Sequence, residues 1–327
     1  MRIVTNFERF EPVWTSRGET GEAVTARTFS DFLRELPACD LLLINCDIAL
    51  TLRLSAYFVM FPWKRKPIVA VDLVLRRPKT FQARMAALVK RALLARVDHF
   101  INYFRDLDGY SSWYGITPER SSFVPFKPNL RYRYEPRLDL PEGDYVLCFG
   151  RSLRDYDTFF DAMEGLPFHG AIPTPDFPSL RVHDSRFTRP LDRLPANVRI
   201  LDDDGSQQTM IRAIEGAKVV AVPVLRSTFA ASGISVYLNA MLLGRSVVIS
   251  NGPGVSDVLT DQAIMVPPED PTALREAIAR VWEDDALRTR LVESGRKYAL
   301  SLGGEPELRA RVLESALAWL RGGLSMR

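Results

Sequence analysis

The sequence predicts an α/β fold made of two doubly wound, Rossmann-like domains with a cleft between them. Short apolar stretches alternate with helical ones along the chain, which is typical of parallel sheets covered on both faces. The 327 residues, 46% hydrophobic and 25% charged, suffice for two domains of ordinary size. A stretch with three prolines and mixed charge, 126–144, interrupts the alternation and is expected to be the linker. We therefore predict an N-terminal domain at 1–135 and a C-terminal domain at 136–327, whose last helix is expected to pack back on the first domain.

The first half contains aliphatic runs of strand length separated by stretches with helical spacing of apolar residues. Each run ends in polar or aromatic residues, where a turn toward the next helix is expected. We expect strands at Arg2–Asn6, Leu41–Asn45, Ile68–Leu73, His99–Tyr103 and Ser122–Pro125, and helices at Phe29–Leu36, Ile48–Phe61, Thr80–Val97 and Leu107–Tyr114.

The second half repeats this alternation and then ends in helices. A proline-rich segment around Ile172–Ser179 is expected to be a loop. We expect strands at Tyr145–Phe149, Val198–Leu201, Val219–Val224 and Ser246–Ser250, and helices at Asp157–Met163, Gln207–Ala217, Pro271–Glu283, Asp285–Leu300 and Glu305–Leu320, with a further helix opening after Gly233 and stopping at Gly244.

A small polar turn at the start of that further helix is the clearest sign of a binding site. The first amides of a helix have no partner within it and carry the positive end of its dipole, so they bind anions. Gly233 lets a phosphate approach the backbone without a Cβ in the way. The turn therefore predicts a diphosphate-binding site, or alternatively the simple cap of an ordinary βαβ unit. Its residues are Ser232, Gly233, Ile234 and Ser235.

Two arginines follow the strand Tyr145–Phe149 in the same domain. Arg151 and Arg154 come directly after Gly150, at the carboxyl end of that strand, where ligands of open α/β sheets usually bind. Guanidinium groups suit paired phosphate oxygens. We therefore expect both arginines to hold the same diphosphate as the turn at Gly233.

The net charge of +3 conceals an uneven distribution. Residues 1–135 carry 21 Lys and Arg against 14 Asp and Glu, whereas the remainder carries 22 against 26. The segment 48–97 holds eleven basic residues and one acid, Asp72. Because it includes an amphipathic, basic stretch from Phe81 to Val97, we expect it to meet an anionic membrane surface, with a merely solvated face as the alternative. No nucleic-acid module accompanies the charge, so nucleic acid is not expected as a partner.

Several classes of protein and site are not expected. No apolar run is long enough to cross a membrane, and the N-terminus does not resemble a signal peptide. Three scattered cysteines and three histidines favour a reduced, cytoplasmic location and give no metal-ligand spacing. Asp202-Asp203-Asp204 precedes Gly205 and predicts a turn. We expect no metal and no cofactor.

Catalytic side chains are expected at strand ends of the first half. Asp72 ends the strand Ile68–Leu73 and is the only acid in a basic segment, so neighbouring cations should lower its pKa and keep it ionised. It would orient an acceptor hydroxyl or act as a base. Asp47 follows the strand Leu41–Asn45 in a similar position, as Asn6 follows the first strand. For each aspartate the alternative is a helix cap or a salt-bridge partner.

The second half resembles the nucleotide-sugar domain of GT-B glycosyltransferases, specifically the family-4 group. The first half is similar only in layout, since it is shorter and lacks the glycine pair after the first strand. In order and spacing the resemblance covers most of residues 145–320. It is carried by Val146–Arg151 with Arg154–Asp157, Leu238–Val248, Gly254–Leu259 and Val266–Asp270.

This resemblance implies roles for individual residues. The family's arginine and a nearby lysine hold the donor diphosphate, and Arg151 and Arg154 stand nearest to them. Two family glutamates are replaced by Ala231 and Asn239. The second glutamate binds the donor ribose, where Asn239 could still hydrogen-bond. The first contacts the sugar ring, which Ala231 cannot do.

The resemblance implies a glycosyltransferase that moves a sugar from a nucleoside-diphosphate sugar to a lipid-linked or polysaccharide acceptor. It is expected to be retaining and metal-independent, and to work in the cytoplasm or on the inner face of the membrane. The alternative is a pseudo-glycosyltransferase that binds nucleotide or glycan as a subunit or scaffold without turnover. Replacement of both glutamates favours the alternative, whereas the two arginines and the turn at Gly233 favour the enzyme.

Overall fold

The computed structural model describes residues 1–16, 18–130, 143–226 and 229–324, and it divides the chain into two compact units. The first unit consists of Met1–Pro125 together with Pro306–Arg327, and the second of Phe126–Glu305. The expected domain boundary at 135/136 and most of the expected linker lie outside the described residues. Within the described part of the chain, no helix is long and apolar enough to span a bilayer.

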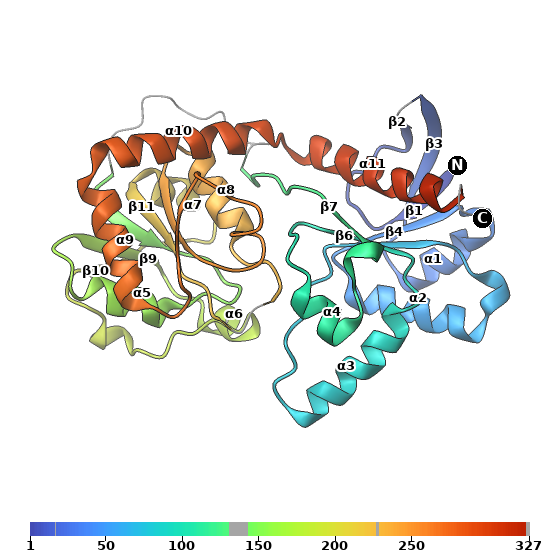
Figure 1. Ribbon diagram of the computed structural model, residues 1–327, viewed down its shortest axis with the longest axis horizontal. Helices are drawn as coiled ribbons and strands as arrows, with labels where there is room; N and C mark the ends of the chain where they lie inside the picture. The colour runs from blue at the N-terminus through green and yellow to red at the C-terminus, as the bar shows by residue number, and fades with distance from the viewer. Residues whose placement is uncertain (17, 131–142, 227–228, 325–327) are drawn as a thin grey trace. The chain divides into compact units, whose positions relative to one another are not determined.

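The N-terminal unit is built on a seven-stranded sheet in the order β2-β3-β1-β4-β5-β6-β7. All neighbouring strands are parallel except β2 and β3, which form an antiparallel hairpin. Its strands are β1 (Arg2–Thr5), β2 (Val13–Ser16), β3 (Glu19–Thr25), β4 (Leu41–Asn45), β5 (Ile68–Val71), β6 (His99–Asn102) and β7 (Ser121–Phe123), and its helices are α1 (Phe29–Glu35), α2 (Ile48–Met60), α3 (Phe81–Leu94), α4 (Asp108–Tyr114) and α11 (Glu305–Leu324) (Figure 1).

The last helix, α11, packs on the sheet of the N-terminal unit. The Oγ atoms of Ser122 and Ser315 are 2.6 Å apart, and the rings of His99 and Trp319 stack with centroids 5.5 Å apart. These contacts join the end of the chain to β6 and β7.

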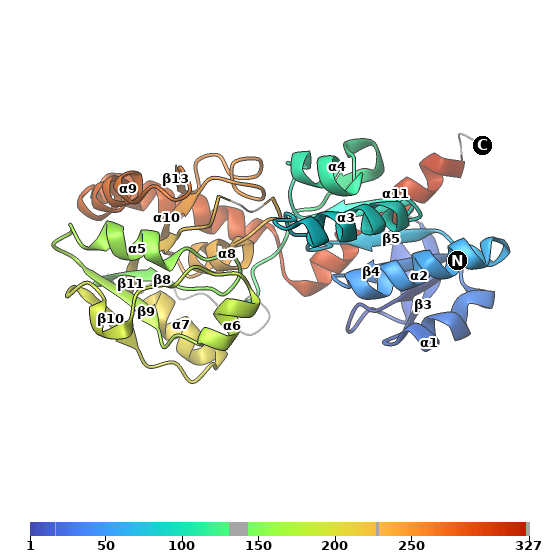
Figure 2. The same cartoon turned by 90° about the horizontal axis from the view of Figure 1, so that it is seen from below.

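The C-terminal unit has a six-stranded, wholly parallel sheet in the order β10-β9-β8-β11-β12-β13. Strand order reverses between β8 and β11, and ligands of open α/β sheets bind at the carboxyl ends of strands at such a reversal. The strands are β8 (Tyr145–Cys148), β9 (His169–Pro173), β10 (Val198–Leu201), β11 (Ala217–Val222), β12 (Ser246–Ser250) and β13 (Ile264–Val266), and the helices are α5 (Tyr156–Met163), α6 (Phe177–Val182), α7 (Gln207–Glu215), α8 (Ile234–Leu242), α9 (Pro271–Glu283) and α10 (Asp285–Ser301) (Figure 2).

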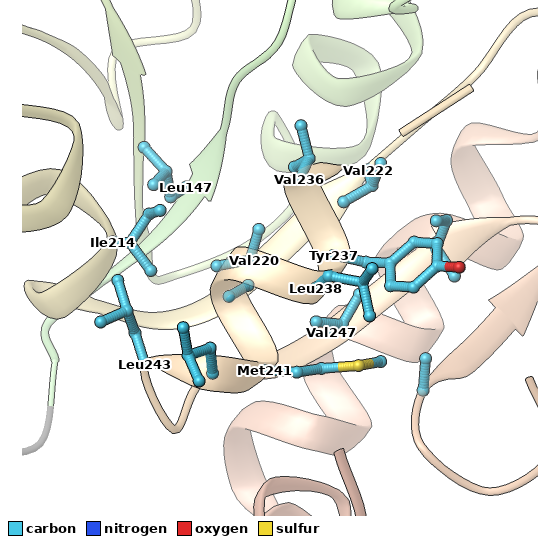
Figure 3. Close-up of a cluster of buried hydrophobic side chains, with 14 of the residues drawn as sticks. Leu147, Ile214, Val220, Val222, Val236, Tyr237, Leu238, Met241, Leu243 and Val247 are labelled. Carbon is cyan, nitrogen blue, oxygen red and sulfur yellow. The ribbon is translucent and has the colours of Figure 1, made fainter. Parts of the chain in front are cut away.

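Alternating strand residues of this unit supply two separate apolar cores. Leu147, Val220 and Val247 pack against α7 and α8, as Figure 3 shows, while their neighbours along the strands pack against α5 and α9 on the other face. This alternation follows from the pleat of a strand, whose successive side chains point to opposite faces. Burial on both faces fixes the register of β8 and β11, and thereby the positions at which their loops begin.

The fold class predicted from the sequence is confirmed, because both units are α/β and Rossmann-like. Some elements were missed. The hairpin β2–β3 and the strands β9 and β13 were not foreseen. The segment Ile172–Ser179 is not a loop throughout, because β9 continues to Pro173 and α6 begins at Phe177. Asp176 caps that helix and Pro178 occupies its first turn, where a missing N–H costs nothing.

Candidate functional site

The loop that follows β8 is tied to the loop that follows β11. Gly150 has φ +117°, a conformation open to glycine, and Leu153 has φ +53°. The amide of Asp155 donates to Pro223 O at 3.0 Å, and the Leu225 amide donates to Leu153 O at 3.1 Å. The two loops at the strand-order reversal are therefore joined by backbone hydrogen bonds.

The first turn of α8 lies at the same end of the sheet. Gly233 is its N-cap residue, with φ +86° and no side-chain cap. Among the hydrogen bonds of the described residues, none begins at the amides of Ile234, Ser235 or Val236. Ser232 is 6% exposed and donates from Oγ to Ser152 O at 2.7 Å, which holds this turn against the loop after β8. The predicted helix N-terminus is therefore present with uncapped amides.

Arg154 lies beneath both loops as a buried cation. Its side chain is 1% exposed, Nη1 donates to Pro223 O at 3.2 Å, and Nε has no hydrogen-bond partner. A Cβ added to Gly150 would lie 2.6 Å from Nη2 of Arg154, and one added to Gly233 would lie 3.5 Å from it. Both glycines therefore make room for the guanidinium, which lies next to the uncapped end of α8.

Arg154 has no carboxylate partner among the described residues. Burial lowers the pKa of its guanidinium, although an arginine stays protonated at neutral pH. The neighbouring carboxylate of Asp155 is paired with Arg186 instead, with Nη2 to Oδ2 at 2.5 Å. A buried charge of this kind is stabilised by an anion, so the arrangement can bind phosphate oxygens.

Arg151 is placed differently from Arg154, since it is exposed. Its backbone carbonyl accepts a hydrogen bond from Ser185 Oγ, which fixes the backbone of the loop. Among the described residues no partner is found for its guanidinium, so its predicted contact with a diphosphate remains a prediction.

Asn239 is 3% exposed and is already engaged by the chain. Its Oδ1 accepts from the amides of Asn129 at 2.9 Å and Leu130 at 3.3 Å. The side chain therefore holds the segment that enters the C-terminal unit. Ribose binding by Asn239 stays a prediction. Because Oδ1 is already engaged, Nδ2 is the atom of this side chain that would bond to the ribose.

Asp47 acts as the N-cap of α2. Its carboxylate accepts from the Leu50 amide at 2.8 Å, which is the cap alternative considered from the sequence. Asn6 is likewise engaged, because it donates from Nδ2 to Asn45 O and accepts the Asn45 amide at Oδ1. These bonds join β1 and β4 at their carboxyl ends; a catalytic role for Asp47 stays a prediction.

Asp72 follows β5 and is partly buried, with a left-handed backbone at φ +48°. The expectation that cations lower its pKa was wrong. Burial raises the pKa of this carboxyl to about 6, and a hydrogen bond from Cys46 Sγ at 3.5 Å opposes the rise. Cys46, after the neighbouring strand, also has positive φ, at +51°. The sequence analysis did not identify Cys46 as a neighbour of Asp72. Its position next to Asp47, at the end of a strand, could have indicated that it lies near the other strand ends.

The aspartates at 202–204 form a turn, as predicted. Asp203 accepts the Gly205 amide and Asp204 accepts the Ser206 amide, each at 2.9 Å. Among the described residues no cluster of His, Cys, Asp and Glu could hold a metal ion.

Residues 193–298 match the family model described as "Glycosyl transferases group 1". The match confirms, for this part of the C-terminal unit, the resemblance inferred from the sequence. A search of curated proteins finds none that matches.

Solved structures of GT-B glycosyltransferases resemble both units of the chain. A sucrose-phosphate synthase from Thermosynechococcus elongatus has a TM-score of 0.63 at 16% identity, covering 99% of this chain and 89% of that one. The HepE protein of Anabaena in complex with UDP has a TM-score of 0.66 at 14% identity, covering 91% and 86%. An α,α-trehalose-phosphate synthase from Burkholderia xenovorans has a TM-score of 0.59 at 15% identity, covering 89% and 76%. At these identities the likeness shows the fold.

Proposed function

We propose that this chain transfers a sugar from a nucleoside-diphosphate sugar whose diphosphate lies between Arg154 and the first turn of α8. The observation that carries the proposal is the Arg154 guanidinium, 1% exposed and without a carboxylate partner in the described part of the chain. An isolated buried charge is costly, and a bound anion removes that cost. The uncapped amides of α8 face the same ligand and add the positive end of the helix dipole.

These groups suit the departure of a nucleoside diphosphate. As the bond from the anomeric carbon to the phosphate oxygen breaks, negative charge grows on the leaving group. Fixed donors that need no rearrangement stabilise such charge most effectively. Arg154 supplies one of them from a buried position, and exposed Arg151 supplies another from the solvent side. We therefore propose that cationic side chains and amides, rather than a metal ion, stabilise the leaving group, and that transfer proceeds with retention.

The acceptor is proposed to be lipid-linked or a polysaccharide, and the proposed location is the cytoplasmic side of a membrane. Asp72 is the acidic group best suited to an acceptor hydroxyl in the N-terminal unit. With its pKa raised to about 6, the carboxyl is ionised at neutral pH and basic enough to accept a proton.

Titration of the full chain with UDP, GDP, CDP, ADP and dTDP, each with and without magnesium, tests the donor site. UDP is the first choice because HepE was solved with UDP and with UDP-glucose. We expect one nucleoside diphosphate to bind and its nucleoside not to bind. Arg151→Ala is expected to weaken binding by about 1.5–3 kcal/mol through loss of a charge-assisted contact. Arg193→Ala is the matched control, since Arg193 is exposed and lies in the short 3₁₀ helix Leu191–Arg193. If the chain bound the nucleoside as tightly as the nucleoside diphosphate, the proposed diphosphate site would be refuted.

A binding protein without turnover is the second candidate. It is favoured by Ala231, which cannot contact a sugar ring through a polar atom, and by Asn239, whose Oδ1 already binds two amides of the chain. Incubation with the sugar conjugate of the nucleotide that binds separates the two functions. Release of nucleoside diphosphate in the presence of a membrane or glycan extract supports transfer, whereas binding without release supports the scaffold.

A further inference from the structure

Eight bulky apolar side chains of the N-terminal unit are exposed within a short stretch of sequence, between residues 59 and 89. Soluble proteins scatter such side chains singly, and a continuous exposed group marks an interaction surface. Elsewhere in the described chain the exposed bulky apolar residues are fewer, and Val13 and Val182 are among them. The group consists of Val59, Met60, Trp63, Val74, Phe81, Met85, Leu88 and Val89.

Helix α3 carries half of this group on one side. Phe81 is 77% exposed, Met85 48%, Leu88 57% and Val89 62%. Positions three and four apart share a face of a helix, so these four residues form one apolar row. The opposite side packs against the unit through Ala87 and Leu94, which are buried.

The polarity of α3 is therefore reversed from that of an ordinary surface helix. Such a helix turns its large apolar residues inward and its polar residues outward. Here the buried residues of α3 are Ala87 and Leu94, and the helix lies beside α2 and α4 (Figure 1), whereas its larger apolar row is exposed. Folding alone gives no reason for this arrangement, because it leaves the larger apolar area in water.

Cations border the apolar row. Arg77, Lys79, Arg84 and Arg96 are exposed, and no ion pair is found for any of them among the described residues. Arg65 is paired with Asp98, which lies just beyond the segment 48–97. The single acid within that segment, Asp72, is partly buried and leaves the surface net positive.

We infer that the outer face of α3 docks on an anionic lipid bilayer, with the apolar row among the acyl chains and the bordering cations at the headgroups. A helix that has one apolar face and one basic border lies in the plane of the interface. The fourteen residues of α3 give a contact about 21 Å long. Nucleic acid would match the charge but not a row of Phe, Met, Leu and Val. Trp63, 75% exposed at the end of α2, is of the residue type that favours the headgroup level.

Flotation of the full chain with vesicles tests this inference. We expect binding to phosphatidylcholine mixed with phosphatidylglycerol and much weaker binding to phosphatidylcholine alone. Reversal of Arg77, Lys79 and Arg84 to Glu is expected to cut binding by roughly a hundredfold or more, since each cation contributes about fivefold. Phe81→Ser with Leu88→Ser, which leaves every charge in place, is expected to cut binding by at least as much.

Val13→Ser with Val182→Ser removes exposed apolar side chains elsewhere and is the matched control, expected to bind vesicles as the unchanged chain does. Nucleotide titration on every variant keeps this inference separate from the donor site, because α3 contributes nothing to that site. Retained flotation of the Phe81/Leu88 variant would overturn the inference. So would absence of flotation together with self-association that the same variant abolishes, since the row would then cover a second copy of the chain.

Discussion

Each unit has a notable ionisable side chain in a loop after a parallel strand, and burial affects the charge of the two side chains differently. Arg154, beyond β8, stays a cation although it is 1% exposed and lacks a carboxylate partner among the described residues. Asp72, beyond β5, responds to burial by a rise in pKa to about 6, so it binds a proton at a higher pH than an ordinary aspartate does. A carboxyl can shed its charge by binding a proton, whereas a guanidinium cannot lose one in this pH range.

This difference indicates what each position can do. A permanently charged, buried Arg154 suits an anionic ligand at any physiological pH. An Asp72 that titrates near 6 suits proton exchange with a hydroxyl. The comparison thus distinguishes a position that binds an anion from one that accepts a proton, and substitutions at both positions test this distinction.

Arg186→Met should have the largest effect on stability. It removes the partner of Asp155, which is fully buried, and leaves an unpaired carboxylate. Loss of one partner of a buried pair costs about 3–5 kcal/mol. Urea denaturation of the unchanged chain and of the variant measures this loss of unfolding free energy. Asp155→Asn with Arg186→Met, which removes both charges, should recover part of the loss, and no recovery would mean that packing rather than charge holds this site.

Asp72→Asn should stabilise the chain at neutral pH by about 1–3 kcal/mol. The folded state holds the proton of Asp72 more tightly than the unfolded chain does, because its pKa rises from 3.8 to about 6. Stability is therefore lost as pH increases from about 3.8 to about 6, and Asn removes that loss while tolerating the left-handed backbone. Denaturation across this pH range is the measurement, and an unchanged pH profile would place the carboxylate in water.

Gly233→Ala should cost about 1–3 kcal/mol of stability and weaken nucleoside-diphosphate binding roughly tenfold. The new Cβ would lie 2.8 Å from Val222 Cγ1 at φ +86° and would stand beside the uncapped amides. Gly205→Ala has a similar φ of +73° with no atom within 4 Å, so it isolates the backbone cost. Equal binding by the two variants would exclude the turn from the anion site.

Ser232→Ala should have the smallest effect, about 1 kcal/mol. It removes the 2.7 Å bond to Ser152 O and loosens one of the links between the two loops. Thermal denaturation with and without nucleotide measures both consequences. A larger loss of binding than of stability would show that Ser232 contacts the ligand directly.

The sequence predicted the layers of both units and the helix N-terminus at Gly233, since strand ends and a Ser-Gly turn are local signals. It could not predict how deeply Arg154 is buried, because burial depends on Pro223 and Gly233, which are distant in the chain. The pKa of Asp72 was misjudged for the same reason. The residues near Asp72 in the sequence are basic, but its carboxyl lies at the carboxyl end of the sheet, beside Cys46.

Asn239 is a second residue whose contacts could not be predicted from the sequence. Its place in the helix was evident, whereas its bonds to Asn129 and Leu130 join positions more than a hundred residues apart. The hairpin β2–β3 escaped notice because its strands are mostly polar on both faces, apart from buried Trp14. Local pattern therefore located the elements, and long-range packing decided what their side chains do.

The role of Arg154 as an anion-binding cation is tested by calorimetric titration of the unchanged chain and of Arg154→Met with UDP, or with whichever nucleoside diphosphate binds. Urea denaturation of both proteins without ligand completes the experiment. We predict that affinity falls by about 1.5–3 kcal/mol while the free variant is no less stable, because an unpaired buried charge has been removed. Unchanged affinity, or a loss of stability as large as that of Arg186→Met, would contradict the account and make Arg154 a structural residue.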